Sequence, residues 1–302
     1  MNEMDVNVQW VFTSMALLGL ASGMIGTFAL LKKQSLIGDA MAHAALPGIC
    51  IAFLFYGQKS LLVFLIGAAC SGYMATVCIQ FIVKHTRIKE DAAIGIVLSV
   101  FFGLGIVLLT WINQHEGGNQ SGINDFLFGK AASLTGNDVS VLTVTAITMV
   151  ITILFFFKEF KIITFDRAFA QGIGIPVSLL NGVLMFLIVS VVVIGLQAVG
   201  VVLMSALLIT PALAARYWTE RLGWMTLLAG VFGALSGVAG AYVSLIAYVP
   251  TGPLVIIFAT ALFLFSFLFA PKRGLCSKII RRHVERKKLR VKQLMYERGE
   301  QL

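Results

Sequence analysis

Charged residues are scarce in this sequence. Asp, Glu, Lys and Arg make up 12% of the 302 residues, whereas 59% are hydrophobic. Soluble globular domains carry about 25% charged residues, so the composition excludes a soluble globule and predicts an integral membrane protein. The net charge of +9 would suggest a nucleic-acid partner in a soluble protein. Here the basic residues border apolar runs and report topology instead, so no nucleic-acid partner is expected.

Several catalytic and binding motifs are also missing. The four cysteines form no CxxC or other metal spacing, which argues against a disulfide framework and a cysteine metal site. The chain lacks the GxxxxGK[ST] phosphate loop, the HExxH metalloprotease motif and the GxSxG nucleophile elbow. The chain is therefore not expected to be an enzyme, and any ATP must be hydrolysed by another subunit.

Long apolar runs dominate what is present. Gly, Pro or charged clusters separate them, and lipid forces each run to satisfy its backbone groups as a helix. The sequence thus predicts an all-α polytopic membrane helix bundle over residues 1–271, followed by a basic cytoplasmic tail over 272–302. The apolar runs cover residues 10–31, 36–56, 60–83, 92–112, 139–157, 177–196, 198–215, 224–248 and 252–270.

The basic residues predict the orientation. With nine transmembrane helices, the N-terminus outside and the C-terminus in the cytoplasm, all but Lys59 and Lys130 of the 23 Lys and Arg residues lie inside. The seventh run is short and contains Pro211. Eight spans plus one broken or short helix is therefore the alternative, although it breaks the charge alternation.

One acid and one histidine lie inside an apolar run, namely Asp39 and His43. They are four residues apart, so a helix places them on one face. If Lys32 and Lys33 mark the membrane surface, a rise of about 1.5 Å per residue puts His43 about 15 Å deep, half of a core about 30 Å thick. A carboxylate at that depth costs about 2.5–3.5 kcal/mol, so it rarely lacks a role.

A carboxylate oxygen beside an imidazole nitrogen suits a divalent metal such as Mn, Fe or Zn. We therefore predict that Asp39 and His43 contact a metal. The alternatives are a structural hydrogen bond between neighbouring turns and a helix start with Asp39 as its N-cap. Two ligands are too few for a closed site, since even tetrahedral zinc takes four. A homodimer with its axis along the pathway would bring two copies of each together.

Two further segments are informative. Residues 157–176 are too polar for a span and too apolar for an ordinary loop. We expect Asp166 to begin a short amphipathic helix that ends at Gly172, with Phe165, Phe169 and Ile173 along one side. A soluble partner could grip such a helix, or it could lie passively in the membrane interface. The small residues and the proline of 200–216 suggest a kinked helix that lines a dimer interface or a pathway.

Two features have simpler interpretations. GxxxG pairs at Gly19 and Gly23, and at Gly233 and Gly237, predict close helix packing. The basic tail could lie against anionic lipid headgroups or form a solvated cytoplasmic helix, and the sequence favours neither.

These residues resemble the membrane permease subunits of bacterial manganese, zinc and iron ABC uptake systems, over nearly the whole chain. The most specific mark is residues 36–48, LIGDAMAHAALPG, which are close to the family's GDAxxHxxLPG signature. Residues 165–175, FDRAFAQGIGI, look like its cytoplasmic coupling region. Residues 200–211 resemble its VGxxLxxALLxxPA stretch.

The resemblance implies a pore-forming permease of a bacterial plasma-membrane importer, with manganese favoured over zinc or iron as cargo and no permanently bound cofactor. It implies a homodimer, a separate cytoplasmic ATPase and an extracellular metal-binding lipoprotein. Asp39 and His43 would contact the metal. The ATPase-coupling residues would be Phe165, Asp166, Phe169, Gly172 and Ile173.

Two other functions compete with this one. A secondary metal or proton-coupled carrier or channel could use Asp39 and His43 as a relay without an ATPase. Such carriers often contain inverted repeats, and no convincing internal repeat occurs here. A membrane enzyme with one bound metal is the third hypothesis, for which the chain offers too few ligands.

Overall fold

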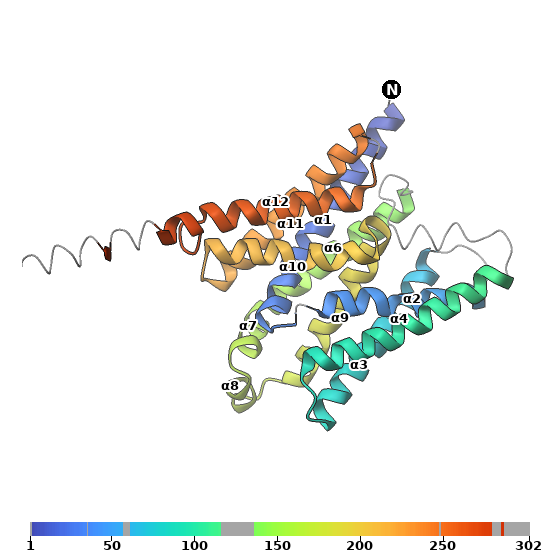
Figure 1. Ribbon diagram of the computed structural model, residues 1–302, viewed down its shortest axis with the longest axis horizontal. Coiled ribbons are helices and arrows are strands. Elements are labelled where there is room, and N and C mark those ends of the chain that lie inside the picture. Colours follow the sequence, from blue (N-terminus) through green and yellow to red (C-terminus); the bar gives the residue numbers. More distant parts are fainter. Residues whose placement is uncertain are drawn as a thin grey trace, which may run out of the picture.

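The computed structural model of the protein is a bundle of helices (Figure 1). It describes residues 2–34, 36–56, 61–115, 136–247, 249–279 and 285–286, and these contain no strand, which confirms the predicted all-α fold. In chain order the helices are α1 (Asn2–Leu31), α2 (Ile37–Tyr56), α3 (Leu61–His85), α4 (Glu90–His115), α6 (Gly136–Phe155), α7 (Phe157–Phe165), α8 (Arg167–Gly172), α9 (Val177–Val199), α10 (Val201–Trp218), α11 (Leu222–Ala247) and α12 (Thr251–Phe269).

Eight helices in the described part of the chain are long and apolar enough to cross a membrane, which makes this a multi-pass membrane protein. The seventh apolar run forms a separate helix, α10, which is not among the eight. Helix α10 begins one residue after α9 ends, because Gly200 adopts φ 97° and ψ 162°, a backbone conformation that suits glycine. The described part of the chain thus holds eight helices that are long and apolar enough to cross and one further helix, α10. A ninth crossing by α10, which the charge pattern requires, stays a prediction.

Helices α1 and α11 pack backbone against backbone. A Cβ atom added to Gly19 would lie 2.2 Å from the carbonyl oxygen of Gly233, and one added to Gly23 would lie 2.1 Å from that of Ala229. Met15 faces Gly237 in the same way further along, so the two helices run antiparallel. The close packing predicted from the GxxxG pairs is confirmed, and we call this contact the glycine seam.

Helix α2 lies between α3 on one side and α4 on the other (Figure 1). On the α3 side, the backbone of α2 packs directly against that of α3, since a Cβ added to Gly48 would be 2.1 Å from the carbonyl oxygen of Gly67. The Thr76 hydroxyl on α3 also donates to the Met41 sulfur, 3.1 Å away. Its α4 side carries residues 39, 43, 46 and 50, which recur at helical spacing on the opposite face.

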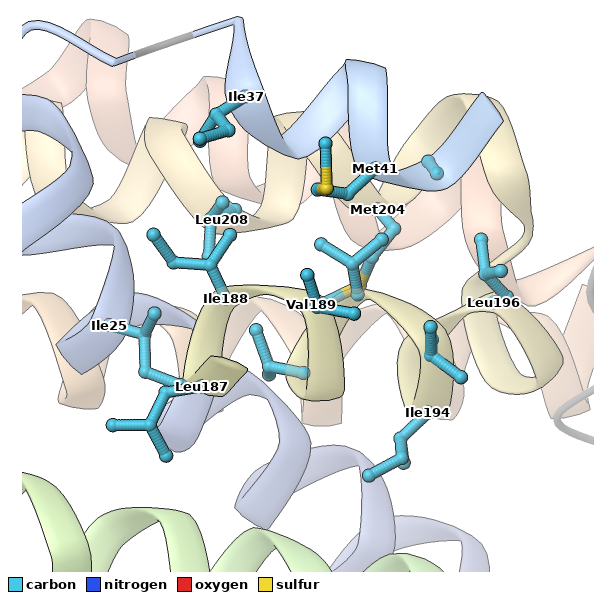
Figure 2. Close-up of a cluster of buried hydrophobic side chains, with 14 of the residues drawn as sticks. Ile25, Ile37, Met41, Leu187, Ile188, Val189, Ile194, Leu196, Met204 and Leu208 are labelled. Atoms are coloured by element: carbon cyan, nitrogen blue, oxygen red, sulfur yellow. The ribbon is translucent and has the colours of Figure 1, made fainter. Parts of the chain in front are cut away.

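The core lies beneath α2, where α9 and α10 cross it. Figure 2 shows Ile37 and Met41 of α2 directed toward Leu208 and Met204 of α10 and Val189 of α9. All five side chains are at most 2% exposed. This apolar packing fixes the position of α10 relative to α2, which matters for the site described below.

The predicted orientation and the division into 1–271 and 272–302 stay predictions. The segment between the fourth and fifth apolar runs, residues 113–137, lies mostly outside the described residues, and so does most of the basic tail. In the described part, α1 ends beside α7, where Phe28 packs edge-on against Phe157 with ring centroids 6.0 Å apart. Helices α7 and α8 therefore lie at the end of the bundle where the linker connects α1 to α2 (Figure 1).

Candidate metal site

Asp39 and His43 lie on consecutive turns of α2. Their nearest side-chain atoms, Asp39 Oδ1 and His43 Nε2, are 3.6 Å apart, and the two side chains are 38% and 20% exposed. Helix α2 begins at Ile37, so Asp39 stands in the first turn rather than before it. The N-cap interpretation of Asp39 is therefore wrong, because the helix starts two residues earlier. We call Asp39 and His43 the polar pair.

Two other helices confine the polar pair. The His43 ring meets Phe102 of α4 edge-on, with ring centroids 4.8 Å apart. From α10, the Ser205 hydroxyl donates to Asp39 Oδ1 across 3.5 Å. Gly38 permits this approach, since a Cβ there would lie 3.6 Å from the Ser205 Cα and 2.8 Å from Leu208 Cδ2. The pair is therefore partly open yet held from both sides.

The backbone beside the pair is altered by Pro47, which lies inside α2. Proline has no N–H, so the carbonyl four residues earlier, that of His43, loses its helical donor. At the next residue, the Ser71 hydroxyl of α3 donates to the Ala44 carbonyl. Helix α3 thus supplies a hydrogen bond where the proline weakens the helix.

A single chain offers few ligands to a metal. Among the described residues, no group of three or more His, Cys, Asp and Glu side chains is gathered closely enough to hold an ion. One carboxylate and one imidazole can hold a divalent transition metal only together with ligands from elsewhere. The chemistry of the polar pair therefore fits a transient or shared site, not a closed structural one.

Lys32, between α1 and α2, belongs to a second polar cluster. Its ammonium group donates to Asn181 Oδ1 of α9, and Gln34 donates to Glu90 Oε1 of α4. Burial, together with the positive charge of Arg167 on α8, lowers the pKa of Lys32 to about 8, while the negative charge of Glu90 acts in the opposite direction. These two hydrogen bonds join the linker before α2 to α4 and α9.

The segment predicted to be amphipathic folds as expected around Asp166. The Asp166 carboxylate caps α8 by accepting the Phe169 N–H at 2.8 Å, and α8 ends at Gly172. Phe165, Phe169 and Ile173 are all more than half exposed. An added Cβ on Gly172 would meet no atom within 4 Å. The segment therefore presents an apolar surface that the described part of this chain does not cover.

Sequence reasoning missed three features of these sites. It did not identify Ser205 or Phe102 as neighbours of the polar pair, and it did not predict helix α7 as a separate element after Phe156. The small-residue stretch 200–216 was the signal for Ser205, because it predicts a helix close to a pathway. For Phe102 the sequence gives no signal, since it is one of many apolar residues on α4.

The sequence matches the ABC 3 transport family over residues 4–270. The protein belongs to this family, the membrane components of ABC transport systems, and the resemblance predicted from residues 36–48 is confirmed. The family is one of transport proteins.

Two curated relatives within this comparison are named for the metal that they transport. The chain is 59% identical over 276 residues to the manganese transport system membrane protein MntC of Bacillus subtilis (strain 168), covering 91% of this chain but only 63% of that protein. It is 44% identical to the zinc transport system membrane protein TroC of Treponema pallidum (strain Nichols), covering 92% of this chain and 94% of TroC.

A solved structure shares the arrangement of helices. PsaBC from Streptococcus pneumoniae in complex with Fab superimposes with a TM-score of 0.77 and 34% identity, covering 88% of this chain and 92% of that chain. An inward-facing metal-chelate type ABC transporter, at 17% identity and a TM-score of 0.63, shares the fold alone.

Proposed function

We propose that this protein is the pore-forming permease subunit of an ABC importer in the bacterial plasma membrane, and that it moves a divalent transition metal into the cell. Manganese is the favoured cargo, because the relative with 59% identity is named for manganese transport. Zinc is the second candidate, since TroC is named for zinc. The metal is cargo and not a resident cofactor.

The observation that carries this proposal is the polar pair. A carboxylate and an imidazole stand partly exposed on one face of α2, a helix whose other side is packed against α3. The pair supplies two ligands per chain, so a homodimer that places two copies across a shared pathway would complete a four-ligand site. Oxygen and nitrogen ligands hold Mn²⁺ or Zn²⁺ without the tight grip of thiolates, as a conduit requires.

The exposed apolar segment around α8 supports a cytoplasmic ATPase partner. Phe165, Phe169 and Ile173 form the contact surface in this proposal, while the Asp166 cap and Gly172 define the ends of α8. An extracellular metal-binding lipoprotein would deliver the metal at the opposite end. A carrier that works without an ATPase is the competing proposal, and membership of an ABC family counts against it.

Uptake of radioactive Mn²⁺ by cells that depend on this system tests the site. Asp39→Ala and His43→Ala should each reduce uptake to background, while the amount of protein in the membrane stays parental. Thr148→Ala is the matched control, because its hydroxyl donates only to the Val144 carbonyl of its own helix. Parental uptake by either alanine variant would place the metal site elsewhere.

The energy source separates the two proposed transport modes. Depleting ATP with the proton gradient maintained should stop uptake, whereas collapsing the gradient with ATP maintained should leave it. The reverse pattern would favour the secondary carrier.

Gly172→Trp should weaken ATPase attachment and spare metal binding, because the added ring projects into open space beside α8. Full ATPase stimulation by this variant would count against the coupling role.

A further inference from the structure

We propose that Ser205 of α10 is a positioning residue of the metal site, whose hydroxyl orients the Asp39 carboxylate for the metal. This inference rests on the proposed function, because it assigns a role within that same site. The contact that motivates it is the hydrogen bond from Ser205 Oγ to Asp39 Oδ1, 3.5 Å long.

The packing of α10 against α2 holds Ser205 close to Asp39. Gly200, in a left-handed conformation, starts α10 directly after α9. The neighbours Met204 and Leu208 are fully buried beneath α2 (Figure 2), and they anchor the turn that carries Ser205. Gly38, which precedes Asp39, leaves room for the Leu208 side chain, whose Cδ2 would lie 2.8 Å from an added Cβ. Three separate features therefore fix the hydroxyl beside the carboxylate.

The chemistry of the contact fits a positioning role. An ionised carboxylate has about four lone-pair positions, so accepting one hydroxyl leaves others for His43 and a metal. Without Ser205, the Asp39 carboxylate would lose this contact with α10 and keep its 3.6 Å contact with His43 on its own helix. Hydrogen-bond partners that orient metal ligands typically change metal affinity about 10–100-fold when they are removed.

The site also becomes dependent on α10. Asp39 and His43 belong to one helix and move together, whereas Ser205 approaches from a helix with a glycine at its start and Pro211 in its interior. A displacement of α10 would withdraw the hydroxyl and leave the polar pair without this orientation. Metal affinity would thus follow the position of α10 relative to α2.

Mn²⁺ uptake by cells at subsaturating metal concentrations tests the inference. Ser205→Ala should reduce uptake about 10–100-fold, and Ser205→Thr should restore it, since threonine keeps the hydroxyl. Ser236→Ala is the control, because that buried hydroxyl donates to the Phe232 and Gly233 carbonyls of α11. The thermal midpoint of Ser205→Ala should equal that of the parent, which separates positioning from a folding defect.

The outcomes distinguish this inference from the proposed function. If Asp39→Ala abolishes uptake while Ser205→Ala transports like the parent, the inference is wrong and the metal site stands. If Asp39→Ala transports like the parent, both are wrong.

Discussion

The two faces of α2 are built on different principles. On the α3 face, Gly48 and Gly67 bring backbones together, with an added Cβ at Gly48 lying 2.1 Å from a carbonyl oxygen. On the α4 face, a Cβ at Gly105 would instead meet the Leu46 side chain, with Cδ2 at 2.7 Å and Cβ at 3.0 Å, and no backbone atom is among these nearest contacts. The same face carries the partly exposed polar pair.

This difference shows how one helix can be fixed and still serve a pathway. Backbone contacts cannot adjust without moving a whole helix, whereas a leucine side chain can change rotamer. The α3 face therefore sets the position of α2. The α4 and α10 face can change shape around the polar pair, and the following variants test that division from the largest expected effect to the smallest.

Gly48→Ala should give the largest loss of stability. Its methyl group would collide with the Gly67 backbone, and such overpacking costs about 1–3 kcal/mol or more, although alanine favours the helix itself by about 1 kcal/mol. The thermal midpoint of the purified protein in detergent measures the effect. Gly182→Ala is the control, because its methyl group would have no atom within 4 Å, and its thermal midpoint should equal or exceed that of the parent. A parental midpoint for Gly48→Ala would contradict the rigid face.

Gly105→Ala should cost less, because Leu46 can move away. Adding Leu46→Ala to Gly105→Ala should then relieve the clash, so that the cost of the double variant is less than the sum of the single costs. The same thermal unfolding assay applies. A loss as large as that of Gly48→Ala would remove the distinction between the two faces.

Lys32 extends the comparison to the linker that begins α2. Its pKa of about 8 in the folded protein lies below the ordinary 10.5, so the unfolded chain binds the proton more tightly. The penalty is fully present below pH 8 and fades as the pH rises toward 10.5. Lys32→Met should be more stable than the parent at pH 7, with the difference shrinking above pH 8.

Thermal midpoints measured from pH 7 to 10 check the Lys32 prediction. Lys84→Met, at an exposed position near the end of α3, is the control and should show no such trend. A stability difference between Lys32→Met and the parent that is constant with pH would refute the assignment of a lowered pKa.

Asp39→Ala should cause no loss of stability, in contrast to its loss of uptake. Removing a carboxylate from the membrane relieves an insertion cost of about 2.5–3.5 kcal/mol, so the thermal midpoint should not fall. A loss comparable with that of Gly48→Ala would instead show that the polar pair is a structural contact, the alternative that the sequence leaves open.

The sequence predicted the fold well because lipid imposes simple rules. Each apolar run became a helix, and the GxxxG pairs became the glycine seam, since both patterns are local. The break after Phe156 was not predicted, because phenylalanine is a residue that helices accept. The number of full crossings depends on α10, a short helix that follows Gly200 and contains Pro211 and Arg216.

The site was predicted only as far as one helix reaches. Asp39 and His43 are visible in sequence because their spacing places them on one face. Ser205 is 166 residues from Asp39, and its approach depends on the turn at Gly200 and on the packing of Met204 and Leu208. Such contacts between distant segments leave no periodic pattern for a sequence to show.

The glycine seam has a genetic consequence. Every single-base change that replaces glycine by another amino acid adds a Cβ atom, and at Gly19, Gly23 and Gly233 that atom would lie within 2.2 Å of a carbonyl oxygen of the facing helix. No amino acid that a single-base change can introduce at these positions therefore fits the contact between α1 and α11. In a random library selected for metal-dependent growth, surviving clones should carry only synonymous changes at these three codons.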